Sequence, residues 1–83
     1  MLNIKILGSG CPNCKRLEQL AREAVEILSI EAQVEKVTDY TAIMEYDILS
    51  TPGLVINEKV VSSGRIPSVA EITTWLTNTL ELV

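Results

Sequence analysis

Gly8-Ser9-Gly10-Cys11-Pro12-Asn13-Cys14 is the stretch that decides the fold, because it joins an apolar run to a helical pattern and holds both cysteines of the chain. The run before it, Leu2–Leu7, is apolar except at Asn3 and Lys5, which predicts a short strand covered on both faces. Two thiols three residues apart close a loop too short to stabilise the chain much by cross-linking. The pair therefore serves redox chemistry, metal binding or plain packing.

After the glycine turn, the apolar spacing changes to steps of three and four residues, which predicts an amphipathic helix from Pro12 to about Ser29. Its apolar positions are Cys14, Leu17, Leu20, Ala21, Ala24, Val25 and Leu28. Pro12 suits the first turn, where a missing N–H costs nothing. Cys11 then lies at or next to the helix N-cap, and Cys14 lies one turn further in.

The next segment predicts a second strand and a short helix. Ala32–Val37 alternates apolar and charged residues, as expected of a strand near a sheet edge. Thr38 or Asp39 can cap a short helix, because either side chain can accept a backbone N–H. This helix carries Tyr40, Ile43, Met44 and Tyr46. The two strands and the long helix between them form a βαβ unit, which requires parallel strands.

The last third predicts a hairpin and a closing helix. The apolar run Leu54–Ile56 returns through the tight turn Asn57-Glu58 to a partner strand over 59–62. A capping box, Ser68-x-x-Glu71, starts the last helix. The buried stripe of that helix is Ile72, Trp75, Leu76, Thr79 and Leu80. The predicted order is β-α-β-α-β-β-α.

Composition limits the possible functions. The 83 residues fit one domain over 1–83, with a Leu, Ile and Val core around Trp75, Tyr40 and Tyr46. The net charge of −4 and the lack of a basic stripe disfavour nucleic-acid binding. Lys5 interrupts the N-terminal apolar run, so no signal peptide is expected, and no run is long enough to span a membrane. We expect a cytoplasmic protein, where a dithiol is redox-active or metal-binding rather than structural.

The two cysteines are predicted to be chemically unequal. Unpaired N–H groups and the positive end of the helix dipole favour a thiolate at Cys11, and such positions lower a cysteine pKa from about 8.5 to about 3.5–7.5. Lys15 and Arg16 add a weak attraction. Cys11 is therefore the predicted nucleophile. Cys14, which lies deeper, suits the resolving role that breaks a mixed disulfide.

Three other interpretations of the pair stay open on these residues. Both cysteines can be ordinary small apolar residues in a redox-inert interaction domain. Two thiolates can also hold Cu(I), or complete a four-ligand centre across a dimer. One chain alone cannot complete such a centre, because it has no His and no third Cys. Copper chaperones share the C-x-x-C position, but they usually place Met where this chain has Ser9, and their element order ends on a strand.

Thr51-Pro52 is the second informative site. Proline directly before a core strand is unusual unless its peptide bond or position is special. A cis bond would leave the Thr51 backbone open beside the helix N-terminus, where it could pair with an extended substrate segment. The alternative is an ordinary trans proline that opens a strand.

On these residues the chain resembles the thioredoxin-like superfamily over nearly its whole length, and most closely the small redox-active disulfide proteins. The resemblance implies an α/β fold, a minimal thioredoxin-like four-stranded mixed sheet flanked by three helices. It also implies a thiol–disulfide oxidoreductase without a cofactor beyond the Cys11–Cys14 disulfide. Catalytic residues are then Cys11 and Cys14, and the substrate-facing positions are Pro12, Asn13, Thr51, Pro52, Gly53 and Gly64.

The chain departs from the family pattern at several positions. Thioredoxins have Trp where this chain has Gly10, and a buried carboxylate where it has Lys5. A Lys5 directed at the pair would favour a Cys14 thiolate; otherwise its ammonium extends to solvent. The glutathione-gripping Gly-Gly-x-Asp of glutaredoxins is absent around Gly64. The resemblance therefore favours a flavoprotein thioredoxin reductase over glutathione as the electron donor of a monomer acting on disulfide-containing protein substrates.

Overall fold

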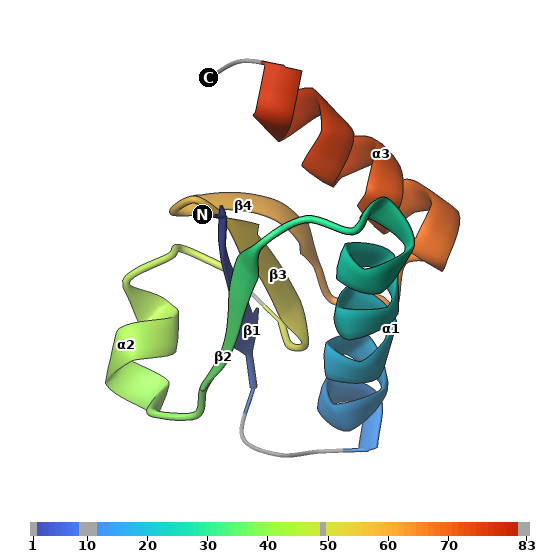
Figure 1. The fold of residues 1–83 in the computed structure, drawn as a ribbon. Coiled ribbons are helices and arrows are strands. Elements are labelled where there is room, and N and C mark those ends of the chain that lie inside the picture. Colours follow the sequence, from blue (N-terminus) through green and yellow to red (C-terminus); the bar gives the residue numbers. More distant parts are fainter. Residues whose placement is uncertain (1, 9–11, 49, 82–83) are drawn as a thin grey trace.

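The computed structural model describes residues 2–8, 12–48 and 50–81. Its elements follow the predicted order, with short connections between them (Figure 1). In chain order they are β1 (Leu2–Leu7), α1 (Pro12–Leu28), β2 (Ala32–Val37), α2 (Tyr40–Met44), β3 (Gly53–Ile56), β4 (Lys59–Ser63) and α3 (Val69–Glu81). The predicted α/β class is confirmed, and the predicted bounds are within one residue at most ends.

The four strands form one mixed sheet in the order β2-β1-β3-β4. β1 runs parallel to β2 and antiparallel to β3, so the predicted βαβ unit is present and β2 lies at the edge. The β3–β4 hairpin turns at Asn57 and Glu58, which have φ values of 50° and 68°. Positive φ at both turn positions matches the right-handed twist of the strands it joins. The hairpin was therefore correctly predicted from its sequence.

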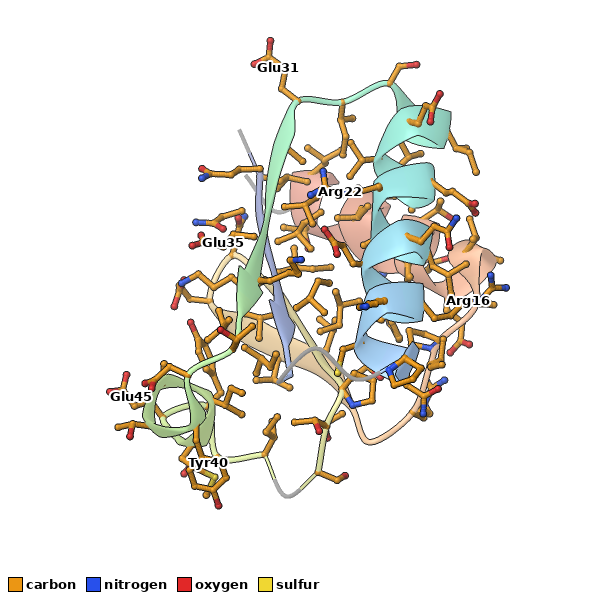
Figure 2. The ribbon with its side chains drawn as sticks, turned by 90° about the horizontal axis from the view of Figure 1, so that it is seen from below. Arg16, Arg22, Glu31, Glu35, Tyr40 and Glu45 are labelled. Carbon is orange, nitrogen blue, oxygen red and sulfur yellow. The ribbon has the colours of Figure 1, made fainter. Side chains whose placement is uncertain are left out.

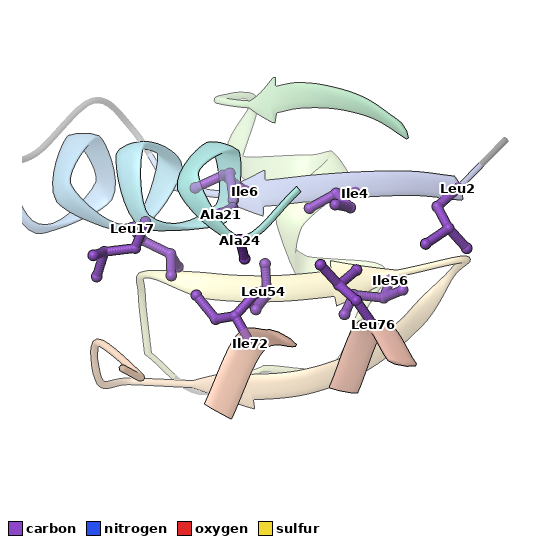
Figure 3. Packing of buried hydrophobic residues seen from close by; sticks show 11 residues of the cluster. Leu2, Ile4, Ile6, Leu17, Ala21, Ala24, Leu54, Ile56, Ile72 and Leu76 are labelled. Carbon is purple, nitrogen blue, oxygen red and sulfur yellow. The ribbon is translucent and has the colours of Figure 1, made fainter. Parts of the chain in front are cut away.

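Helices cover both faces of this sheet. α1 and α3 lie together on one face and the short α2 lies on the other (Figure 1). The larger core lies between the sheet and helices α1 and α3, and in it Ile4, Ile6, Leu17 and Leu54 are at most 1% exposed (Figure 3). A smaller cluster under α2 contains Leu7, Ile43, Ile48 and Val55. Alternation along β1 sends even-numbered residues to the larger core and Leu7 to the smaller one.

The capping box at α3 forms as predicted. The Glu71 N–H donates to Ser68 Oγ at 3.1 Å, and the Ser68 N–H donates to Glu71 Oε1 at 3.2 Å. Two orphan backbone donors of the helix start are thereby satisfied. Arg65 forms an ion pair with the same carboxylate at 2.8 Å. The start of α3 is thus fixed by local hydrogen bonds as well as by its buried face.

Two predictions about the core are wrong. Tyr40 was expected inside, but its side chain is 74% exposed because it lies at the first residue of α2, on the outer side of that helix (Figure 2). Leu80 was expected in the buried stripe of α3 and is 42% exposed, since the end of this helix extends past the sheet (Figure 1). Trp75 and Tyr46 are partly buried, and Tyr46 follows α2 rather than belonging to it. No helix among the described residues is long and apolar enough to cross a membrane.

Candidate functional site

Cys14 is the third residue of α1, and its side chain is 5% exposed. Its sulfur is part of a disulfide. Pro12 and Asn13, which precede it in the first turn of the helix, are exposed. Cys11, Ser9 and Gly10 lie outside the described residues, so the predicted position of Cys11 at the helix start stays a prediction. The described half of the pair is buried, as expected for the cysteine further into the helix.

Gly8 lies directly against Cys14. A Cβ at Gly8 would overlap Cys14 Sγ and would lie 3.2 Å from Cys14 Cβ. The same Cβ would lie 3.9 Å from Thr51 Cβ, so the end of β1, the start of α1 and the loop before β3 meet at this point. From the sequence, Gly8 was expected only to form part of the turn before the helix. A sequence signal existed, because Gly8 continues the even-numbered side of β1 that faces α1.

The loop before β3 provides the second side of the site. The Thr51–Pro52 peptide bond is cis. Thr51 is exposed, whereas Pro52 is buried. An exposed Thr51 next to Gly8 leaves this part of the loop accessible beside the buried cysteine.

Gly64 holds this loop from the side of the hairpin. Its N–H donates to the Pro52 carbonyl at 2.9 Å. Its φ is 74°, in the left-handed region that favours glycine, and a Cβ there would overlap Ser50 Oγ. Gly64 therefore supports the loop through its backbone and through its lack of a side chain.

Gly53 contributes differently from the other predicted site residues. It is the buried first residue of β3, and a Cβ there would lie 3.0 Å from Ile48 Cδ1 and 3.2 Å from Leu7 Cδ1. Both neighbours belong to the small cluster under α2. The absence of a side chain at Gly53 therefore allows close packing in this cluster.

Lys5 lies on the face of the sheet that α2 covers, away from α1. Its ammonium donates to Tyr46 Oη at 3.0 Å and forms an ion pair with Glu58, and its side chain is only 19% exposed. The pKa of Lys5 is raised most by its hydrogen bond to Glu58 and next by its hydrogen bond to Tyr46. The Lys5 hydrogen bond in turn lowers the pKa of Glu58. The ammonium therefore neither points at Cys14 nor extends freely into solvent.

A pocket of about 260 Å³ opens between α2 and the loop before β3. Its lining residues are Thr38, Tyr40, Ile43, Met44, Ile48, Ser50 and Thr51. The sequence did not predict this pocket, because Tyr40, which lines it, was expected in the core. Thr51 belongs both to this pocket and to the contact region around Gly8. The pocket therefore continues the surface next to the cysteine.

The described residues offer little for a resident metal. No group of three or more potential ligands among Cys, Asp and Glu side chains comes together in the part of the chain that the structure describes. The predicted four-ligand centre would need a second chain, and the predicted Cu(I) site would need Cys11, which lies outside the described residues. The geometry described above is arranged around a disulfide.

Comparison with known proteins identifies relatives along nearly the whole chain. Residues 2–77 match the family model described as a thioredoxin domain. A thioredoxin of Methanocaldococcus jannaschii is 42% identical over 98% of this chain and 93% of its own length. A thioredoxin of Methanothermobacter thermautotrophicus is 42% identical over 87% of this chain and 94% of its own length. These matches support the oxidoreductase hypothesis and give no support to the metal-binding alternative.

Solved structures agree on the fold. The germline-specific thioredoxin Deadhead of Drosophila melanogaster matches with a TM-score of 0.63 and 20% identity, over 93% of this chain and 79% of that one. Thioredoxin 1 of Thermosipho africanus matches with a TM-score of 0.59 and 19% identity, over 96% of each chain. The chain therefore belongs to the thioredoxin family and is a thiol–disulfide oxidoreductase.

Proposed function

We propose that Cys11 and Cys14 form the redox pair of this oxidoreductase, with Cys11 as the attacking and Cys14 as the resolving cysteine. The supporting observation is that Cys14 is buried, disulfide-bonded and in contact with the site formed by Gly8 and Thr51. Cys11 is the other cysteine of the sequence and directly precedes α1. A thiolate is favoured at a helix N-terminus, which suits the attacking role.

The reaction transfers two electrons from the protein dithiol to a substrate disulfide. The Cys11 thiolate attacks one substrate sulfur, forms a mixed disulfide and expels the other substrate sulfur as a thiolate. The Cys14 thiolate then attacks Cys11 Sγ and expels the second substrate thiolate. Both departing thiolates are protonated by water, because Lys5 is engaged with Tyr46 and Glu58 on the opposite face of the sheet. The products are a reduced substrate and an oxidised protein.

The substrate is a protein segment that carries a disulfide. We place this segment along the exposed Thr51, where its backbone can pair with the loop as an added strand. An apolar side chain of the segment then enters the pocket beside α2, which Tyr40 and Met44 line. Pro12 and Asn13 border the segment on the α1 side, since both are exposed there. Gly64 acts by supporting Pro52.

The proposed cellular setting is the one that the thioredoxin relatives support. The reductant is a flavoprotein thioredoxin reductase, and the partners are disulfide-containing proteins of the cytoplasm. The protein acts as a monomer without nucleic acid or a membrane, and its only redox group is the cysteine pair. Elemental analysis after anaerobic purification, together with an insulin-reduction assay, tests whether the cysteine pair is redox-active or holds a metal. Stoichiometric metal without insulin reduction would favour the metal-binding alternative.

Alkylation of the reduced protein by iodoacetamide tests the two cysteine roles. We expect the Cys14→Ser variant to react with a midpoint clearly below the ordinary thiol pKa of about 8.5, because only Cys11 remains. The matched Cys11→Ser variant should react slowly, since Cys14 is buried. Cys14→Ser should also trap a mixed disulfide with insulin. A faster Cys11→Ser variant, or failure of Cys14→Ser to trap substrate, would contradict the assignment.

A further inference from the structure

Gly8 has a contact that turn formation does not explain. The residue is buried at the end of β1, and the site of its missing side chain is occupied by the sulfur of Cys14. Any other residue would place a Cβ where that sulfur lies. One of the two groups would have to move.

The backbone of Gly8 is not free to move away. Its N–H donates to the Val37 carbonyl at 3.0 Å, which continues the parallel pairing of Leu7 with Val37. Leu7 is also paired with Gly53 on the other side, so the end of β1 is held between two strands. An added methyl group must therefore be accommodated by the cysteine.

The cysteine can respond in only one of its two redox states. A thiol side chain can rotate about χ1 among staggered positions at little cost. In the disulfide the same sulfur is bound to a second sulfur, so rotation would break or distort the bond. The overlap at Gly8 therefore penalises the disulfide more than the dithiol.

We propose that Gly8 is a positioning residue that sets the redox balance of the cysteine pair. Its lack of a side chain leaves room for the Cys14 sulfur in the disulfide, so glycine at this position favours the oxidised protein. A residue with a side chain would shift the balance toward the dithiol and make the protein a weaker reductant. This inference rests on the proposed pairing of Cys11 with Cys14.

Equilibration with dithiothreitol tests the proposal in the intact chain. The protein disulfide and dithiothreitol exchange two electrons and two protons to give the protein dithiol and cyclic oxidised dithiothreitol. We expect Gly8→Ala to lower the equilibrium constant for forming the protein disulfide by at least about tenfold, which corresponds to ~30 mV for this couple. The Val55→Ala variant is the control, because it removes packing from the cluster under α2. It should lower stability equally in both redox states and leave the equilibrium constant unchanged.

Urea unfolding provides a second readout. Gly8→Ala should destabilise the oxidised protein more than the reduced protein, and the difference should equal the shift measured with dithiothreitol. If Gly8→Ala does not fold, the double variant with Cys14→Ala should fold, because the overlapping sulfur is gone. Equal destabilisation of both redox states, or no recovery in the double variant, would overturn the proposal.

The experiment also separates this proposal from the assignment of the pair. A wild-type protein that does not exchange with dithiothreitol would overturn both. A wild-type protein that exchanges, with an unchanged constant in Gly8→Ala, would overturn the role of Gly8 alone. The cysteine roles would then stand on their alkylation profile.

Discussion

The face of the sheet under α1 and α3 differs from the face under α2 in how it is filled. The first is packed with aliphatic side chains from four elements, β1, α1, β3 and α3 (Figure 3). Cys14 lies on the same face, against Gly8. The second has a small cluster, a charged group formed by Lys5, Tyr46 and Glu58, and an open pocket. The same sheet therefore holds the buried Cys14 sulfur on one side and offers an accessible apolar surface on the other.

The difference teaches that rigidity and accessibility are supplied by separate halves of the molecule. A buried sulfur needs close-packed surroundings, because interiors transmit small changes in volume. A surface for varied protein segments needs exposed apolar groups instead. The loop with Thr51 and Pro52 connects the halves, since Thr51 is near Gly8 and also lines the pocket.

The largest expected effect is on stability and distinguishes the two cores. Leu17→Ala removes a fully buried side chain from the larger core and should lower the free energy of unfolding by about 3–5 kcal/mol. Ile43→Ala, in the smaller cluster beside the pocket, should cost only about 2 kcal/mol because its surroundings can relax. Urea unfolding of both variants measures this. Equal losses would show that the two faces are packed alike.

The next effect is on substrate use rather than on stability. Tyr40→Ala should lower kcat/KM for a protein disulfide roughly three- to tenfold, which is the effect of losing an aromatic contact of about 1 kcal/mol. Reduction of a small aromatic disulfide should not change, because it cannot reach the pocket and the cysteine together. Ile27→Ala is the matched control, since Ile27 is 65% exposed on α1 and does not line this pocket. Equal losses for both variants or both substrates would rule out a role for the pocket.

A smaller effect concerns acid stability at the start of α3. The pKa of Glu71 is lowered to about 2, most by the hydrogen bond from Arg65 and next by the hydrogen bond from the Ser68 backbone N–H. Since the folded-state pKa lies below the unfolded one, this carboxylate stabilises the fold above about pH 5 and the contribution disappears as the pH falls toward 2. Glu71→Gln should therefore flatten the loss of stability between these pH values. Arg65→Gln should reproduce most of this change, and an unaltered slope in both variants would contradict the pairing.

The smallest effect should come from Lys5. Lys5→Met removes the ammonium from the charged group formed by Lys5, Tyr46 and Glu58. It should lower the free energy of unfolding only slightly, because the Glu58 carboxylate is largely exposed. The pH profile of iodoacetamide alkylation should stay the same, since Lys5 lies across the sheet from α1. A shift in that profile would show that the charged group acts on the cysteines, and the separation between the two faces would fail.

Much of the fold was predictable from local patterns. Neighbouring residues alone decide the change of apolar spacing after Gly8. The same holds for the Asn57-Glu58 turn and for the capping box of Ser68 and Glu71. The positions of Tyr40 and Leu80 were not predictable in this way. Both residues lie at helix ends, where exposure depends on how far the helix extends beyond the sheet.

The sequence by itself determined the element order, the edge position of β2 and the place of Cys14 in the first turn of α1. These follow from backbone chemistry and hydrophobic period, which act over a few residues. Only the tertiary structure decided that Gly8 contacts Cys14, that Gly64 holds Pro52, and that Lys5 bonds to Tyr46 and Glu58 rather than pointing at Cys14. Such contacts join segments distant in sequence, and they form only when the sheet and helices pack around a shared core.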